Sequence, residues 1–181
     1  MGTDKALILF DGQTFLERAM VVARSVSPEV SIVGDPEKYG RFAPCIPDLY
    51  PNCGPLGGIH AALHSSGAEL NLMVAVDLPF ITAGLLQFLL ARAGQSETAI
   101  VTIPRAARGL QPLCAVYRRD FVVPAEQALR SGHYKIGDLF SPQNAEVIEE
   151  DALLAAGFSA KMFQNLNTPE DLTEAKKKAE R

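Results

Sequence analysis

Short apolar segments alternate along this chain with segments of helical periodicity. Strand-like runs of apolar and β-branched residues lie at 6–10, 30–33, 43–46, 70–76, 99–103, 113–117 and 145–148. Helical patterns lie at 14–25, 59–64, 82–93 and 121–129, and 168–171 reads as a further helix start. This alternation predicts an α/β protein, a three-layer α/β/α sandwich with a mostly parallel sheet. No linker or internal repeat divides residues 1–181, so we expect a single domain.

The apolar run 70–76 ends on a carboxylate, Asp77, and Pro79 then breaks the pattern. The run predicts a buried parallel strand that delivers Asp77 to its C-terminal edge, where open α/β sheets bind ligands. A charge there is costly unless it is paired, and a hard cation such as Mg²⁺ is a suitable partner. Because Asp is also a preferred helix N-cap, a cap for the following turn or helix is the alternative.

Composition excludes several other classes of protein. Hydrophobic residues make up 48% of the 181 residues, as in a globular domain, and the formal net charge of -4 gives no general field for nucleic acid. Cysteines are three in number and show no CxxC spacing, which fits a reducing compartment. We see no bilayer-spanning run and no signal peptide. We therefore expect a cytoplasmic protein that binds neither nucleic acid nor membrane.

A glycine-rich stretch, Gly54-Pro55-Leu56-Gly57-Gly58, precedes the helix predicted from about residue 59. Backbone can approach a nucleotide closely there, and free N–H groups at the helix start can face its oxygens. The stretch is not a Walker loop, because no Lys-Ser or Lys-Thr follows the glycines. An ordinary structural loop is the alternative.

Several other polar residues lie where they can carry chemistry. Lys5 precedes the first apolar run and can neutralise phosphate charge, or be an ordinary solvated lysine. Asn165 and Asn167 are one residue apart, so alternation directs both to one side, although turn and cap chemistry also explains Asn167. His60 and His64 share a helix face at the spacing of two zinc ligands, but no third ligand is evident, which favours ordinary histidines.

The order of these features is more specific than any one of them. The segments 1–7, 54–59, 76–80, 111–113 and 165–172, together with Asp48, resemble the molybdenum cofactor guanylyltransferase (MobA-type) family of nucleotidyltransferases. The resemblance implies a nucleotide-binding, Rossmann-like sheet. It also implies Mg²⁺-dependent transfer of GMP from GTP to the terminal phosphate of Mo-molybdopterin, with release of pyrophosphate.

Roles for individual residues follow from the same resemblance. Lys5 would contact the phosphates, Asp77 would hold Mg²⁺, and Asp48 with residues 54–58 would line the guanosine site. Asn165 and Asn167 would lie on the pterin or metal side. Transient contacts with molybdoenzymes or their chaperones are implied for delivery of the product. The alternatives are a molybdopterin cytidylyltransferase or related nucleotidyltransferase, and a non-catalytic relative that binds nucleotide or cofactor.

The sequence departs from the family pattern at its beginning. In the family, Met-Gly-x-Asp-Lys ends a longer segment, a hydrophobic strand followed by the phosphate loop Leu-Ala-Gly-Gly-x-Ser-x-Arg. The present sequence begins at the tail of that segment. Either the reading frame extends upstream, or we expect a gap at the centre of the sheet and weak or absent GTP turnover. Removal of a central strand exposes two edges, which favours association.

Overall fold

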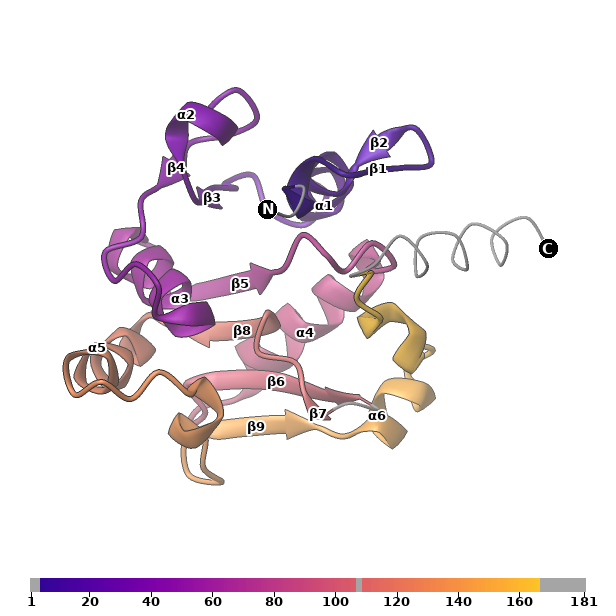
Figure 1. Cartoon of the computed structure of the whole chain (residues 1–181). Coiled ribbons are helices and arrows are strands. Elements are labelled where there is room, and N and C mark those ends of the chain that lie inside the picture. The colour runs from indigo at the N-terminus through magenta and orange to yellow at the C-terminus, as the bar shows by residue number, and fades with distance from the viewer. Residues whose placement is uncertain (1–3, 107–108, 167–181) are drawn as a thin grey trace.

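A mixed sheet forms the centre of the protein in the computed structural model, which describes residues 4–106 and 109–166 (Figure 1). Its path is β5 (Leu70–Val74), β8 (Cys114–Arg118), β6 (Val101–Ala106) and β7 (Gly109–Leu110), with β9 (Ala145–Ile148) also on β6. β8 runs antiparallel to β5 and β6, whereas β9 runs parallel to β6. Strands β5, β6 and β9 thus run in one direction and β8 runs against them, so the α/β class is confirmed and the central sheet is mixed, with β6 and β9 as its parallel pair.

Helices cover both faces of this sheet. On one face, α3 (Gly54–Ser65) and α5 (Val122–Arg130) form a core with β6 and β8. On the other face, α4 (Ala83–Gln95) and α6 (Glu150–Ala155) form a second core with β8 and β9. The predicted three-layer arrangement is therefore confirmed.

The alternation of side chains along β8 explains why both faces are apolar. Ala115 and Tyr117 pack into the core with α3 and α5, while Cys114 and Val116 pack into the core with α4. Successive residues of a strand point to opposite faces, so a central strand covered on both sides reads as a continuous apolar run. Burial of both faces of β8 therefore explains the continuous apolar run at 113–117 in the sequence.

The N-terminal part is a separate small unit packed beside the sheet. A capping box begins α1: the Thr14 hydroxyl accepts the Glu17 N–H at 3.2 Å, and Glu17 Oε2 accepts the Thr14 N–H at 2.7 Å. This confirms the helix start expected at Thr14. In chain order, the elements of this part are η1 (Lys5–Leu7), β1 (Leu9–Phe10), β2 (Gln13–Thr14), α1 (Phe15–Arg24), β3 (Ile32–Val33), α2 (Pro36–Tyr39) and β4 (Cys45–Ile46).

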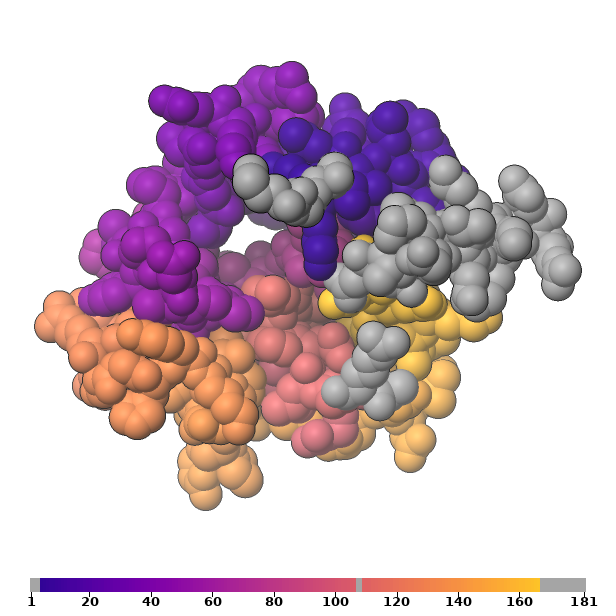
Figure 2. Space-filling view, in the orientation of Figure 1, coloured from indigo at the N-terminus to yellow at the C-terminus, as the bar shows by residue number. Residues whose placement is uncertain are grey.

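Strands β3 and β4 pair in parallel as a second sheet, and among the described residues neither is hydrogen-bonded to β5. Figure 2 shows an opening between the part that carries β3 and β4 and the part that carries β5. The hydrogen bonds from Arg119 to Glu69 and from Ala75 to Leu113 turn alternate backbone groups of β5 toward β8. The backbone groups of Leu70, Leu72 and Val74 therefore face the open edge.

Three further short 3₁₀ helices lie in the described part of the chain: η2 (Arg119–Phe121), η3 (Ile136–Leu139) and η4 (Ala160–Phe163). In the part of the chain that the structure describes, no helix has the length and apolar character needed to cross a bilayer.

Arg118, at the end of β8, ties the sheet to the C-terminus of α4. Its Nε donates to the Ala99 carbonyl at 3.1 Å, and its Nη2 donates to the carbonyls of Ala93 at 3.1 Å and Ser96 at 2.7 Å. Its Nη1 pairs with Glu69 at 2.8 Å. A guanidinium suits this position because its planar fork serves several acceptors, including the unpaired carbonyls of a helix end.

We predict that Arg118→Gln lowers the free energy of unfolding by about 2–3 kcal/mol, because hydrogen bonds from a charged group to several carbonyls are lost. Urea unfolding measures the change. Arg119→Gln is the matched control, since Arg119 is exposed and keeps its backbone bond to Glu69. Equal stability of the two variants would contradict this account.

Candidate active site

Asp77 lies in a turn beyond β5, which ends at Val74 and not at Val76 as the apolar run suggested. Its side chain is half-buried, and within residues 4–106 and 109–166 its carboxylate has no hydrogen-bond or ion-pair partner. The helix that follows is capped by Thr82, whose hydroxyl accepts the Leu85 N–H at 3.3 Å. The interpretation of Asp77 as a helix cap is therefore wrong, and its oxygens are available to a ligand.

Lys5 is brought toward the same region by an apolar cluster. It is the first residue of η1, and its neighbour Ala6 is buried against Leu16 and Met20 of α1. Val76, the residue before Asp77, packs against this cluster too. The segments that carry the lysine and the carboxylate are thus fastened to the same group of side chains.

The glycine-rich stretch is helical and not a loop. α3 begins at Gly54, which has a positive φ of 64°, and Pro55 occupies its first turn. Proline is pre-organised for that position, and glycine adopts positive φ without strain. Cys53 precedes the helix and makes no side-chain cap. The first-turn N–H groups of α3 therefore remain available for an anionic or polar ligand.

Asp48 lies directly against this helix start. Its Oδ1 accepts the N–H of Tyr50 at 2.9 Å. A Cβ added to Gly57 would lie 2.7 Å from the Tyr50 carbonyl oxygen and 3.1 Å from Oδ1 of Asp48. Gly57 therefore permits a close approach that any larger residue would prevent, and this approach holds Asp48 beside α3.

The last described segment of the chain, which ends at Leu166, reaches Asp77 as well. The Leu166 N–H donates to the Asp77 carbonyl at 3.2 Å, and the Leu166 side chain is buried against Phe10 and Phe15. Asn165, half-buried, is thus adjacent to Asp77 in space. Asn167 and the helix start expected at 168–171 lie outside the described residues.

His60 and His64 do not form a metal site with other groups. Their rings stack at 5.7 Å, and no cluster of three or more His, Cys, Asp or Glu suited to a metal occurs in the described ranges. His60 is only 2% exposed and lies edge-on to Tyr50 at 5.1 Å, and neither of its ring nitrogens has a hydrogen-bond partner among the residues that the structure describes. Burial lowers the pKa of His60, with His64 and Arg130 acting in the same direction.

Comparisons with known proteins agree with this architecture. Residues 1–147 match the family model described as the MobA-like NTP transferase domain. The molybdopterin-guanine dinucleotide biosynthesis protein A of Archaeoglobus fulgidus superposes with a TM-score of 0.82 at 26% identity, over 99% of this chain and 92% of that chain. The fold is therefore that of a nucleotidyltransferase.

Two curated relatives make the assignment more specific. The probable molybdenum cofactor guanylyltransferase of Pelotomaculum thermopropionicum is 36% identical over 99% of this chain and 87% of its own length. The molybdenum cofactor guanylyltransferase of Desulfosudis oleivorans is 32% identical over 96% of this chain and 86% of its own length. The chain belongs to the MobA-like NTP transferase family, which confirms the resemblance stated from the sequence.

We predict that Gly57→Ala lowers the free energy of unfolding by about 1–3 kcal/mol, because the new methyl group forces Tyr50 and Asp48 away from α3. Gly58→Ala is the matched control, since a Cβ there meets only Val33 at an ordinary 3.6 Å. Chemical denaturation of the two variants measures the difference. Equal free energies of unfolding for the two variants would show that the close approach at Gly57 does not contribute to stability.

We also predict an acid-sensitive contribution from His60. Its pKa is lowered in the folded state from an ordinary 6.5, so the unfolded chain binds the proton first as the pH falls. The contribution of neutral His60 to the free energy of unfolding is fully present above about pH 6.5 and is lost as the pH falls below that value. Urea unfolding at pH 7.5 and 5.5 should show a smaller pH effect in His60→Leu than in the parent chain. In the exposed control His133→Gln, a pH effect like that of the parent is expected.

Proposed function

We propose that this chain transfers GMP from GTP to the terminal phosphate of Mo-molybdopterin, with release of pyrophosphate. The observation that carries the proposal is the convergence of three distant segments on Asp77. Ala6 and Val76 pack in one cluster, and Leu166 hydrogen-bonds to the backbone of Asp77. Lys5, Asp77 and Asn165 are the sequence neighbours of these contact residues, so all three lie in one region of the molecule.

Asp77 is the proposed ligand of Mg²⁺. A half-buried carboxylate with no cationic partner in the described ranges fits a hard ion that prefers oxygen ligands and keeps several waters. When bound, such an ion neutralises charge on the phosphate oxygens during transfer. Asp77 would fix its place at the sheet edge, and the Leu166 hydrogen bond holds the backbone of Asp77.

Lys5 and the start of α3 are proposed to bind the nucleotide. Lys5 adds positive charge where pyrophosphate leaves. Asp48 and residues Gly54 to Gly58 would line the guanosine side, with the first-turn N–H groups of α3 directed at polar atoms. Phosphoryl transfer depends mainly on alignment and charge, and a phosphate nucleophile is already ionised near neutral pH. No general base is required from the protein.

Asn165 is proposed to face the pterin side of the site, and the same role is proposed for Asn167 from its spacing alone. We infer that the reaction takes place in the cytoplasm and that molybdoenzymes or their chaperones receive the product through transient contacts.

Substitutions at Asp77 and Lys5 test the proposal directly. We predict that Asp77→Asn and Lys5→Ala each lower GMP incorporation into Mo-molybdopterin by about 10²- to 10³-fold, the range for removal of one charge-stabilising group. Asp120→Asn and Lys161→Ala are the matched controls, because both side chains are exposed and lie in other elements. Full turnover by Asp77→Asn would rule out the metal-ligand role.

Nucleotide choice is tested separately by thermal shift with GTP, CTP and ATP in the presence of Mg²⁺. A bound nucleotide stabilises the folded chain according to its occupancy, so GTP should give the largest shift. A larger shift with CTP would indicate a cytidylyltransferase. Binding of Mo-molybdopterin without any release of pyrophosphate would indicate a non-catalytic relative.

A further inference from the structure

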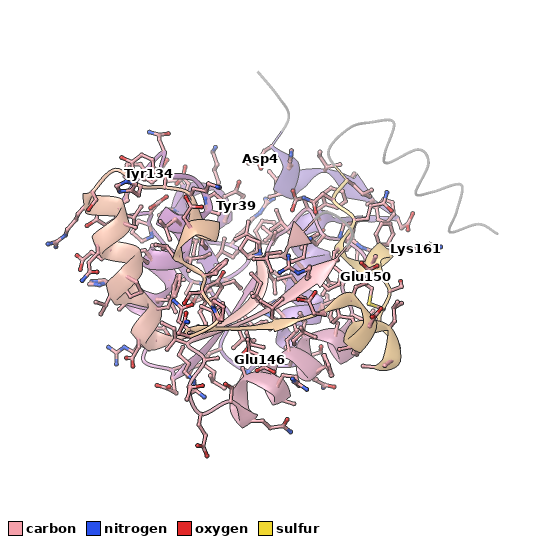
Figure 3. All side chains as sticks on the ribbon, turned by 90° about the horizontal axis from the view of Figure 1, so that it is seen from below. Asp4, Tyr39, Tyr134, Glu146, Glu150 and Lys161 are labelled. Carbon is pink, nitrogen blue, oxygen red and sulfur yellow. The ribbon has the colours of Figure 1, made fainter. Side chains whose placement is uncertain are left out.

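A hydrogen bond joins two segments far apart in the chain, next to the lysine proposed to bind phosphate. The Tyr39 hydroxyl donates to Oδ2 of Asp4 at 2.7 Å, and Figure 3 shows the two residues near each other on one side of the molecule. The other oxygen, Oδ1, accepts the N–H of Ala6 at 3.1 Å. Both oxygens of Asp4 are therefore engaged, and Asp4 directly precedes Lys5 in the chain.

Tyr39 is held firmly before any ligand binds. It ends α2, whose start is fixed by Asp35, which accepts the Glu37 N–H at 2.9 Å, and by Pro36 in the first turn. Its ring rests on the backbone at Gly34, where an added Cβ would lie 3.0 Å from Cδ2 of the ring. Local structure thus places the hydroxyl within reach of Asp4.

The bond is charge-assisted and persists over a wide pH range. Burial raises the pKa of Tyr39 to about 12, and the hydrogen bond to Asp4 and the charges of Asp4 and Asp35 act in the same direction. The hydroxyl therefore keeps its proton and remains a donor at neutral pH. Hydrogen bonds to an ionised acceptor are shorter and about twice as strong as neutral ones.

Asp4 in turn fixes the backbone of the turn that carries Lys5. It is the N-cap of η1, and its bond to the Ala6 N–H spans Lys5. Without the Tyr39 hydroxyl, Asp4 loses one of the two hydrogen bonds that hold its carboxylate within the described residues, and its side chain gains rotational freedom. The turn is short, so its geometry depends on this cap more than that of a long helix would.

We propose that Tyr39 is a positioning residue for nucleotidyl transfer, which holds Lys5 in place through Asp4. This rests on the proposed function, in which Lys5 contacts the phosphates of the nucleotide. Tyr39 acts through Asp4 and Lys5, and not through the reacting atoms.

The first test is Tyr39→Phe, which keeps the ring on Gly34 and removes only the hydroxyl. We predict that kcat/KM for GTP falls about tenfold, consistent with loss of one hydrogen bond to a charged group. Ser131→Ala is the control, because it also removes one hydroxyl hydrogen bond, to the Gln127 carbonyl at 2.8 Å, but at the exposed end of α5, and it should retain the parent value. An unchanged kcat/KM in Tyr39→Phe would overturn the proposal.

A double-mutant cycle separates positioning of Lys5 from a general structural effect. In a Lys5→Ala background, Tyr39→Phe should have no further effect, because the group that it positions is absent. A further tenfold loss in that background would overturn the proposal. If Lys5→Ala alone keeps full turnover, the proposed role of Lys5 fails. If Lys5→Ala is impaired and Tyr39→Phe is not, only the positioning role fails.

Amide hydrogen exchange at Ala6 gives a reading that does not depend on turnover. Its N–H is bound by Asp4, so Tyr39→Phe should accelerate its exchange by about tenfold, while amides of β8 keep their protection. Unchanged exchange at Ala6 would overturn the proposal even if the assay detected no GMP transfer. Faster exchange at Ala6 together with lower kcat/KM would support it.

Discussion

The candidate site depends on a small apolar cluster at the junction between the N-terminal part and the main sheet. Ala6, Leu16 and Met20 are buried there, and Val76 and Tyr39 pack against them. Each part that meets at the cluster carries a polar residue of the site on a neighbouring position. Burial of this apolar surface therefore sets the geometry of the polar groups, because a close-packed cluster fixes the backbone on either side of it.

This arrangement differs from a site built on one continuous sheet. Asp77 follows β5 in the main sheet, whereas Lys5 and Asp48 belong to the part that contains β3 and β4. Between these parts, no strand ladder is present among the described residues. They are held together by side-chain packing: Val76 packs against the cluster of Ala6, and Leu166, whose N–H donates to the Asp77 carbonyl, packs against Phe10 and Phe15. Relative movement of the parts would change the site without disturbing either core.

Local rules in the sequence accounted for much of the fold. The capping box at Thr14 and Glu17 and the strand at 145–148 agree with the structure, because each depends on residues close in sequence. The family pattern pointed to Lys5, Asp48 and Asp77; the structure places Lys5 and Asp77 next to residues of the same apolar cluster and places Asp48 against the start of α3. The contact between Tyr39 and Asp4 was not predictable, since 35 residues separate them and only tertiary packing brings them together.

The glycines were the signals most easily misinterpreted. Composition alone suggested a flexible loop at 54–58, but the structure has a helix there, and Gly57 is required by contact with Tyr50 and Asp48. Gly34 serves the same purpose beneath the ring of Tyr39. At both positions the missing side chain makes room for a close neighbour, Tyr50 with Asp48 at Gly57 and the Tyr39 ring at Gly34. A glycine in such a segment indicates close packing as readily as conformational freedom. The two cases are distinguished by the residue that packs against the glycine in the folded structure.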